Sequence, residues 1–426
     1  MNTASDQELP PLVTLQAALS RITETLASAI ARPTDAAPDW SESEWLLARA
    51  VSTIHGVSPL LSRTLHWQAP PGWQEFLQEQ RTHTENRHVR IQELLDQLHD
   101  AARRADIALV ALKGAALHSL GLYIPGERPM ADIDLLVREQ DSLRARRMIE
   151  GLGFHLTHTN WKHQAFAAND ETAPAVFGEH STNSMKIELH DGIREQLPLR
   201  GVDVSRCVFP KEGAPGLNDY PSLAALMMHL LLHAAGAMSL RAVRLIQLND
   251  IARLSASMSS ADWDDFLSQE ALLDQTLWWS FPPLALTARH FDSIPSRIVN
   301  SMSQRCHWWL KQSCRRRTLS DVSLCYLWVE AFPGIEWARS PREMLAYISQ
   351  RIAPQAHQRS LRKVAAVTEL TAAQSNWAHM SQSRRILRWL TTRPARPQAL
   401  HPIRAALTQP RQPRSPMAQP VATAEI

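Results

Sequence analysis

The most constraining feature of the sequence is an Asp-x-Asp pair inside an apolar stretch, ADIDLLV, at residues 131–137. In an extended strand, successive side chains alternate between faces, so Asp132 and Asp134 share one face while the apolar residues can be buried on the other. Neighbouring carboxylates repel each other unless a cation lies between them, and Mg²⁺ favours such pairs. The pair therefore predicts a divalent-metal site on a sheet, with a solvated turn at a strand end as the alternative.

A Lys-Gly corner precedes this pair along the chain. Residues 107–112 form an apolar run typical of a short strand, and residues 114–120 are predicted to form the helix that leaves the corner. Gly114 would let the backbone approach a phosphate closely, and Lys113 could neutralise the phosphate charge. The N-terminus of the following helix would also favour an anion. The corner therefore indicates a phosphate site beside the predicted metal site.

The segments LKGAAL and PGERPMADIDLLV, followed by a short helix and GLGF, resemble the uncharacterised nucleotidyltransferase family of the DNA polymerase β-like superfold. The resemblance begins near Trp40, in a helical lead-in, and extends to LIQLNDIARL after the core. It implies a small sheet with Asp-x-Asp on one strand and a third carboxylate on a neighbouring strand. Residues 185–190 alternate polar and apolar, which puts Lys186, Glu188 and His190 on one face of a strand. Glu188 is the candidate third carboxylate.

The resemblance also implies a chemistry. Asp132, Asp134 and Glu188 would hold Mg²⁺ or Mn²⁺ and would be the catalytic residues, with an NTP as substrate and a hydroxyl of an unidentified acceptor as nucleophile. Nucleotidyl transfer would release pyrophosphate. Four residues are expected at the triphosphate: Lys113, Gly114, Ala115 and Arg128. Asp250 is a secondary candidate for contacting the site.

Two other functions remain open. Ala115 stands where the superfold usually has a serine hydroxyl, which favours a non-catalytic nucleotide-binding or partner protein on a degenerate scaffold. Basic helices and a basic tail near the C-terminus would suit an RNA-end nucleotidyltransferase. The acceptor could be a small molecule, a protein or an RNA.

The expected fold class is α+β, a small mixed sheet of the polymerase β-like type embedded in a mostly helical chain. Glycine is scarce, at 14 of 426 residues, which favours helix. The expected divisions are a flexible N-terminal segment (1–36), a helical lead-in (37–104), the nucleotidyltransferase α/β core (105–215), a helical domain packing on the core (216–300), a C-terminal helical region (301–390) and a disordered Pro/Arg-rich tail (391–426). Within the lead-in, Ser41 and Glu44 predict a capping box for a helix over 42–54.

Charge and apolar patterning limit the partners. A formal net charge of +3 with 20% charged residues gives no overall field for nucleic acid, and the N-terminus lacks the pattern of a signal peptide, so a cytoplasmic protein is expected. Residues 223–240 are nearly long enough to span a bilayer, but His229, His233 and Ser239 interrupt them. They predict a buried core helix with packing histidines and no membrane association.

Three further clusters allow two interpretations each. Seven tryptophans between residues 263 and 337, with nearby arginines, could form a core or a nucleic-acid surface, and the core is favoured. Residues 381–391 read as a basic amphipathic helix. His155, His158 and His163 could suggest zinc, but their spacing fits no rigid element and few carboxylates lie nearby in the sequence, so no zinc site is predicted.

Overall fold

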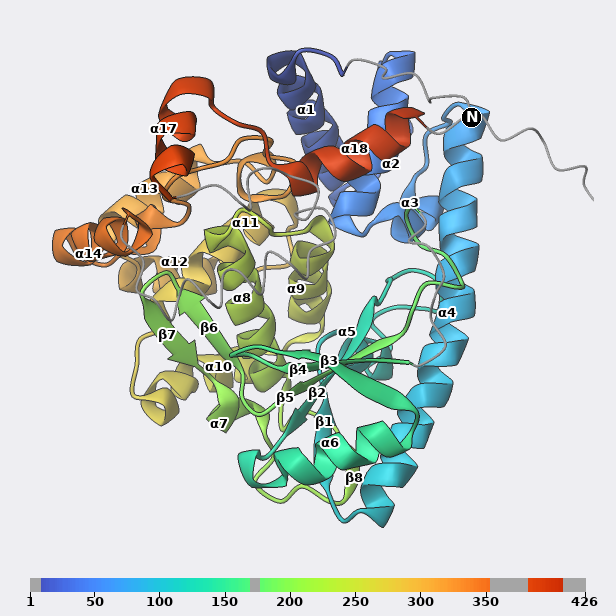
Figure 1. Cartoon of the computed structure of the whole chain (residues 1–426), viewed down its shortest axis with the longest axis vertical. Coiled ribbons are helices and arrows are strands. Elements are labelled where there is room, and N and C mark those ends of the chain that lie inside the picture. Colours follow the sequence, from blue (N-terminus) through green and yellow to red (C-terminus); the bar gives the residue numbers. More distant parts are fainter. Residues whose placement is uncertain (1–8, 169–176, 353–381, 409–426) are drawn as a thin grey trace, which may run out of the picture.

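The computed structural model describes residues 9–168, 177–352 and 382–408 (Figure 1). A six-stranded mixed sheet lies among helices, which confirms the predicted α+β class with a small mixed sheet. The strands are β1 (Ala108–Ala111), β2 (Asp132–Val137), β3 (Phe154–Thr159), β4 (Gln164–Ala168), β5 (Lys186–His190) and β8 (Gly216–Asn218), in the order β3-β4-β5-β2-β1-β8. A separate hairpin pairs β6 (Arg194–Leu197) with β7 (Arg200–Asp203).

Strand β2 is central, antiparallel to β1 and parallel to β5. In this register Asp134 lies opposite Glu188, and Ile133 lies opposite Ile187. The alternation predicted from the sequence therefore holds on both strands, because directly opposed residues of neighbouring strands share a face. One face of the β2–β5 pair is apolar, and the other carries the carboxylates.

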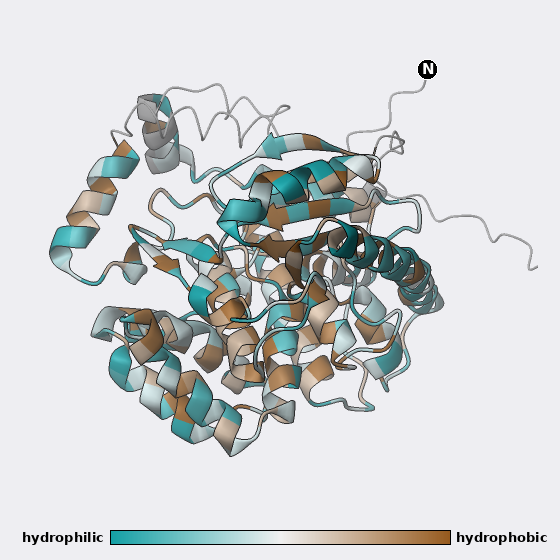
Figure 2. Ribbon diagram, turned by 90° about the horizontal axis from the view of Figure 1, so that it is seen from below, coloured by the Kyte–Doolittle hydropathy of each residue, from teal (hydrophilic) through white to brown (hydrophobic). Residues whose placement is uncertain are grey.

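The apolar face is covered by two helices, α4 (Pro71–Arg104) and α6 (Ser142–Gly151). Leu94 and Leu98 of α4 and Ile149 of α6 pack in one buried cluster with Ile133 and Ile187 of the sheet. Figure 2 shows this pattern along the ribbon, with hydrophobic residues concentrated on the strands and on the inward faces of helices. Because α4 and α6 occupy this face, the carboxylates point to the opposite side.

A helical layer lies on that opposite side. It begins with α8 (Leu223–Ser239) and α9 (Leu245–Ser257), which pack against each other. The short helix α7 (Ser205–Val208) precedes β8 in the chain. The helices that follow α9 include α10 (Ser260–Leu273), α11 (Phe281–His290), α12 (Ser296–Arg305), α13 (Trp308–Arg316) and α14 (Pro341–Ile352). Most residues of α8 are buried, which confirms the predicted core helix. In the described part of the chain, no helix combines the length and apolarity needed to cross a membrane.

The lead-in consists of α2 (Glu42–His55), α3 (Ser58–Thr64) and α4. The predicted capping box is present: the Ser41 hydroxyl accepts a hydrogen bond from the Glu44 N–H, and the Glu44 carboxylate accepts one from the Ser41 N–H at 2.9 Å. Gly56 ends α2 in the left-handed region, with φ at +66°. These local signals explain why the boundaries of α2 could be predicted.

The prediction of a flexible segment over residues 1–36 is wrong for most of that segment. Residues Leu12–Ala31 form α1, whose apolar stripe of Leu15, Leu19, Ile22 and Leu26 is fully buried in the main core. The helix packs on α2. The spacing of these apolar residues at i, i+4 and i+7 is typical of an amphipathic helix. The proline-bearing stretch after the helix is only a short connection. Residues 1–8 lie outside the described residues.

The predicted disordered tail is also wrong in its first part. Residues Pro397–Thr408 form α18, which packs on α2 and buries Ala399, Ile403 and Ala406 (Figure 1). The proline and arginine content of this segment led to the prediction of disorder. The segment also contains three small or branched apolar residues at spacings of four and three, which place them on one face of a helix. The basic helix expected over 381–391 corresponds to α17 (Gln382–Thr392). Ser381 and residues 409–426 lie outside the described residues.

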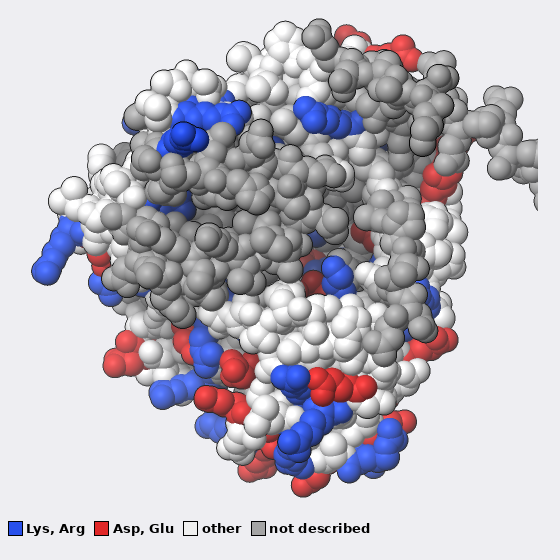
Figure 3. Space-filling view, viewed as in Figure 1, with Lys and Arg blue, Asp and Glu red and all other residues white. Residues whose placement is uncertain are grey.

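The tryptophan-rich region is mainly core. Trp263, Trp278, Trp279 and Trp337 are buried, as the core interpretation predicted, whereas Trp308 is exposed. On the lower part of the face shown in Figure 3, basic and acidic residues are interspersed and do not gather into a patch of one sign. The four cysteines are free, and three of them are buried.

The C-terminus of α2 is hydrogen-bonded to the start of α9. The His55 Nδ1 accepts a hydrogen bond from the Leu245 N–H at 3.0 Å, so Nε2 carries the proton and donates toward Cys325 Sγ at 3.5 Å. Burial lowers the pKa of His55 to about 3, and the nearby Arg244 adds repulsion. The histidine is therefore neutral in the folded protein.

This neutral histidine predicts acid sensitivity. An unfolded histidine has a pKa of about 6.5, so below that pH the unfolded chain binds a proton that the folded chain refuses, and the unfolding free energy falls as the pH drops toward 3. The variant His55→Asn has no titrating ring at this position, so the contribution of its protonation to the unfolding free energy is absent. The asparagine side-chain oxygen can replace Nδ1 as hydrogen-bond acceptor. We expect the variant to lose less unfolding free energy than wild type between about pH 7 and about pH 5 in urea titrations. Equal losses in the two proteins would contradict this assignment.

Candidate active site

The three predicted carboxylates meet at one cavity of about 340 Å³ on the side of the sheet that faces α8 and α9. Asp132 and Asp134 come from β2 and Glu188 from β5. The other walls are formed by the corner after β1, by the loop before β2, and by α8 and α9; they include Lys113, Gly114, Arg128, Pro129, Met130, Ala131, Leu230, His233, Arg244, Ile246, Gln247 and Asp250. Six of the seven predicted site residues line this cavity.

Ala115 is the seventh and lies elsewhere. It is buried in the apolar cluster with Met130 and Ile133. Gly114 does line the cavity, but the space that a side chain would occupy is filled from the protein: a Cβ there would overlap Arg128 Nη1 and lie 2.6 Å from Met130 Sδ. The glycine therefore accommodates the close packing of these two side chains.

Asp134 is hydrogen-bonded to two basic side chains. Its Oδ1 accepts hydrogen bonds from Lys113 Nζ and from His190 Nε2, each at 2.9 Å. Burial alone would raise the pKa of this carboxyl, but Lys113 and His190 outweigh burial and hold the pKa well below its usual range. Burial would likewise lower the pKa of Lys113, and the Asp134 and Asp132 carboxylates raise it instead. Asp134 is thus a carboxylate and Lys113 a cation.

Lys113 is held in an unusual conformation. Its φ is +46° with ψ at −109°, a region that residues with a side chain rarely adopt. Its N–H donates to the Tyr220 hydroxyl at 3.3 Å, and that hydroxyl is 2.7 Å from His229 Nδ1 on α8. His229 is buried, as the packing interpretation predicted. The strained backbone aims the lysine at Asp134.

Asp132 has no hydrogen-bond or ion-pair partner among the residues that the structure describes. Burial, together with the neighbouring Asp134 and Glu188 carboxylates, raises the pKa of its carboxyl to about 6. A carboxylate left without a partner beside two others is a position where a bound divalent cation would be stabilising. The donor set of three carboxylates suits Mg²⁺ or Mn²⁺.

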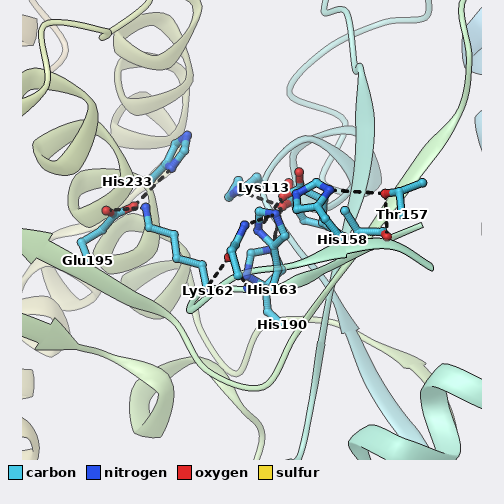
Figure 4. Close-up of polar contacts among 12 residues, drawn as sticks. Lys113, Thr157, His158, Lys162, His163, His190, Glu195 and His233 are labelled. Atoms are coloured by element: carbon cyan, nitrogen blue, oxygen red, sulfur yellow. Dashed lines mark hydrogen bonds and ion pairs between the residues drawn. The ribbon is translucent and has the colours of Figure 1, made fainter. Parts of the chain in front are cut away.

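Glu188 of β5 lies near two histidines, His190 at the end of the same strand and His163 in the turn before β4. Figure 4 shows these two histidines side by side. The Glu188 Oε2 is 3.1 Å from His163 Nδ1 and 3.7 Å from His190 Nε2. Burial would lower the pKa of His190, but its contacts with Asp134 and Glu188 outweigh burial and raise it. The three side chains offer donor atoms within 4.8 Å of one another, a geometry that could hold a metal ion. Few carboxylates lie near His163 in the sequence, but the pairing of β4 with β5 brings Glu188 to it.

The tautomer of His163 is determined by Asn160. The Asn160 Oδ1 accepts the N–H groups of Lys162 and His163, so its Nδ2 faces His163 Nε2 at 3.0 Å as a donor. Nε2 must accept, and Nδ1 therefore carries the proton. Burial lowers the pKa of His163 to about 4, so the ring is neutral. His163 Nδ1 is close to Glu188 Oε2 but lacks the geometry of a hydrogen bond, so the neutral ring acts as a packing neighbour of that carboxylate.

A second polar group adjoins the cavity at α8 (Figure 4). Lys162 Nζ is 2.6 Å from Glu195 Oε2, and His233 Nδ1 is 3.9 Å from Glu195 Oε1. A Cβ at Gly236 would overlap Glu195, so the glycine makes room for this buried carboxylate. His233 lines the cavity and its side chain is 36% exposed, whereas His229 is buried. Its i, i+4 relation to His229 gave no indication of which ring would be exposed.

Arg128 and Asp250 are both in the cavity wall, but they are bonded to each other. The guanidinium donates to Asp250 Oδ1 through Nε and to Oδ2 through Nη2, each at 2.8 Å. The Tyr123 hydroxyl also donates to Asp250, at 2.7 Å. Because Asp250 neutralises it, Arg128 is less available to a phosphate than the sequence suggested.

A known protein family matches the part of the chain that contains this cavity. A family model described as an uncharacterised nucleotidyltransferase matches residues 41–277, which include every wall of the cavity described above. No curated protein and no solved structure matches the chain. The match covers more than half of the 426 residues. The chain therefore belongs to the uncharacterised nucleotidyltransferase family.

Proposed function

We propose that the protein is a metal-dependent nucleotidyltransferase that transfers a nucleoside monophosphate from an NTP to a hydroxyl of an acceptor. The observation that carries this proposal is the convergence of Asp132, Asp134 and Glu188 on one cavity wall, with Asp134 and Glu188 directly opposed on parallel strands. Structural carboxylate clusters are usually paired with basic side chains, whereas Asp132 has no partner in the described part of the chain. An unpaired buried carboxylate is costly and marks functional sites.

The three carboxylates would hold Mg²⁺ or Mn²⁺. When bound, such an ion neutralises triphosphate charge and polarises a phosphoryl oxygen. Lys113 supplies a fixed positive charge at the same wall. The contribution of the protein is then to position the NTP and acceptor in a cavity whose dipoles are already oriented.

Glu188 is the candidate proton acceptor. Its Oε2 faces His163 and His190, while Oε1 has no partner among the described residues and can take the acceptor proton. The acceptor oxygen then forms a bond to the α-phosphorus, and the bond to the pyrophosphate leaving group breaks. The packing of His163 against the carboxylate would restrict its orientation during this step.

The test is pyrophosphate release from each of the four NTPs with Mg²⁺ or Mn²⁺, using a cell extract as the pool of acceptors. Release that stops in EDTA and returns when the metal is restored would support the proposal and identify the nucleotide. NTP binding without pyrophosphate release from any acceptor fraction would favour the non-catalytic scaffold, for which the missing hydroxyl at Ala115 is the supporting observation. Labelling of RNA in the extract would identify the RNA-end activity.

A further inference from the structure

The cavity wall contains three cations whose surroundings differ. Lys113 is paired with Asp134 at 2.9 Å, and Arg128 is paired with Asp250 at 2.8 Å. Arg244 also lines the cavity, but within the described residues no carboxylate lies within ion-pair distance of it. The carboxylates that act on its charge from further away are Glu179, Asp132 and Asp250.

The side chain of Arg244 is held in place by a hydrogen bond to the helical lead-in. Its Nε donates to the carbonyl of Ile54 at 3.0 Å, in the last turn of α2, where unpaired carbonyls carry partial negative charge. Its backbone N–H donates to Gln247 Oε1 at 2.8 Å in the first turn of α9. The terminal amino groups, Nη1 and Nη2, have no hydrogen-bond acceptor in the part of the chain that the structure describes.

The space for the guanidinium depends on Gly56. A Cβ at that position would overlap Nη2 and lie 2.9 Å from Cζ of Arg244. Gly56 also adopts a φ of +66°, which a glycine accommodates without strain. The C-terminal glycine of α2 therefore both ends the helix and lets the arginine side chain lie against it.

The half-buried guanidinium has no carboxylate within ion-pair distance among the described residues. Burial lowers the pKa of Arg244, Glu179 opposes this, and Arg128 adds repulsion. Because a guanidinium remains protonated in proteins, burying its charge destabilises the folded protein until an anion binds. A planar fork with two free amino groups matches the oxygens of a phosphate.

From this geometry we propose that Arg244 is the principal phosphate-binding residue of the cavity, with polyphosphate as its ligand class. The assignment rests on the proposed function for the identity of the substrate, an NTP. It replaces Arg128, which would have to release Asp250 before it could bind a phosphate. Four carboxylates and three cations line the cavity, so divalent cations bound at the carboxylates would give the net positive charge that a triphosphate requires.

The experiment measures binding of inorganic tripolyphosphate to the full chain by calorimetry in the presence of Mg²⁺. We expect Arg244→Gln to weaken binding at least about tenfold, the usual effect of removing a charge-assisted hydrogen bond. Arg244→Lys should recover part of the loss because it keeps the charge. The matched control is Arg297→Gln, which removes an exposed arginine paired with Asp264 and should bind as wild type does.

A second variant tests the assignment without removing the arginine. Gly56→Ala keeps Arg244 but displaces its guanidinium, so it should also weaken tripolyphosphate binding while far-UV circular dichroism stays native. Wild-type affinity in Arg244→Gln, or no tripolyphosphate binding by the wild type, would overturn the assignment. Binding that depends on Arg244 without pyrophosphate release from any NTP would uphold the phosphate site and reject catalysis, so the two proposals can fail separately.

Discussion

Asp132→Asn is expected to lower pyrophosphate release by about a thousandfold, roughly 4 kcal/mol at 1.36 kcal/mol per factor of ten, without destabilising the fold. The substitution keeps the shape of the side chain and removes one ligand charge. Since Asp132 has no partner in the described residues, no ion pair is lost. Its charged form is opposed by burial and by Asp134 and Glu188, so the variant should be at least as stable as wild type above about pH 6.

Two measurements check this expectation. Pyrophosphate release is followed at saturating metal, and the unfolding free energy is obtained from urea titrations in EDTA. Asp264→Asn is the control, because its carboxylate is 63% exposed and lies in a surface ion pair. Turnover by Asp132→Asn close to that of the control would reject Asp132 as a metal ligand. A large loss of stability would instead show that Asp132 has a structural partner.

Asp250→Ala is expected to destabilise the protein by about 3–5 kcal/mol, the cost of leaving a buried charge unpaired. The Arg128 side chain is 11% exposed and that of Asp250 is 2% exposed, so water cannot replace the lost carboxylate. The Tyr123 hydroxyl loses its acceptor as well. The change is measured as a shift of the urea midpoint at constant slope.

The double variant Arg128→Met/Asp250→Ala separates charge burial from packing. Removing both charges leaves no unpaired ion, so we expect the double variant to be more stable than Asp250→Ala alone. Asp264→Ala, at the exposed pair with Arg297, should change stability by no more than about 1 kcal/mol. Equal destabilisation of the double and single variants would mean that the pair contributes through shape and not through charge.

The parts of the site that lie on one strand or one corner were predictable from the sequence. The period of two in DIDLLV and KIELH fixes which face each carboxylate occupies, and no other information is needed. The strand corner of Lys113 and Gly114 is equally local. Even the third carboxylate required only the assumption that its strand lies beside the first.

Contacts between distant segments were not predictable in this way. The pairing of Arg128 with Asp250 joins residues 122 positions apart, and the two had been expected to serve the same cavity without neutralising each other. Arg244 immediately precedes the helix motif LIQLNDIARL, so it was outside the pattern that drew attention to Asp250. His163 and Glu188 meet only through the β3–β4–β5 order, which depends on a turn that Asn160 stabilises. The periodicity of a sequence predicts which side chains share one face of a helix or strand. It does not predict which of these faces pack against each other.

The attachment of residues 244 and 245 to the end of α2 has a consequence for the order of assembly during synthesis. These hydrogen bonds span 190 positions, so they can form only after the whole sheet has been made. A nascent chain ending at Asn218 already contains all three carboxylates but not the arginine. The sheet side of the cavity therefore emerges from the ribosome first and remains without this cation until the start of α9 has been made.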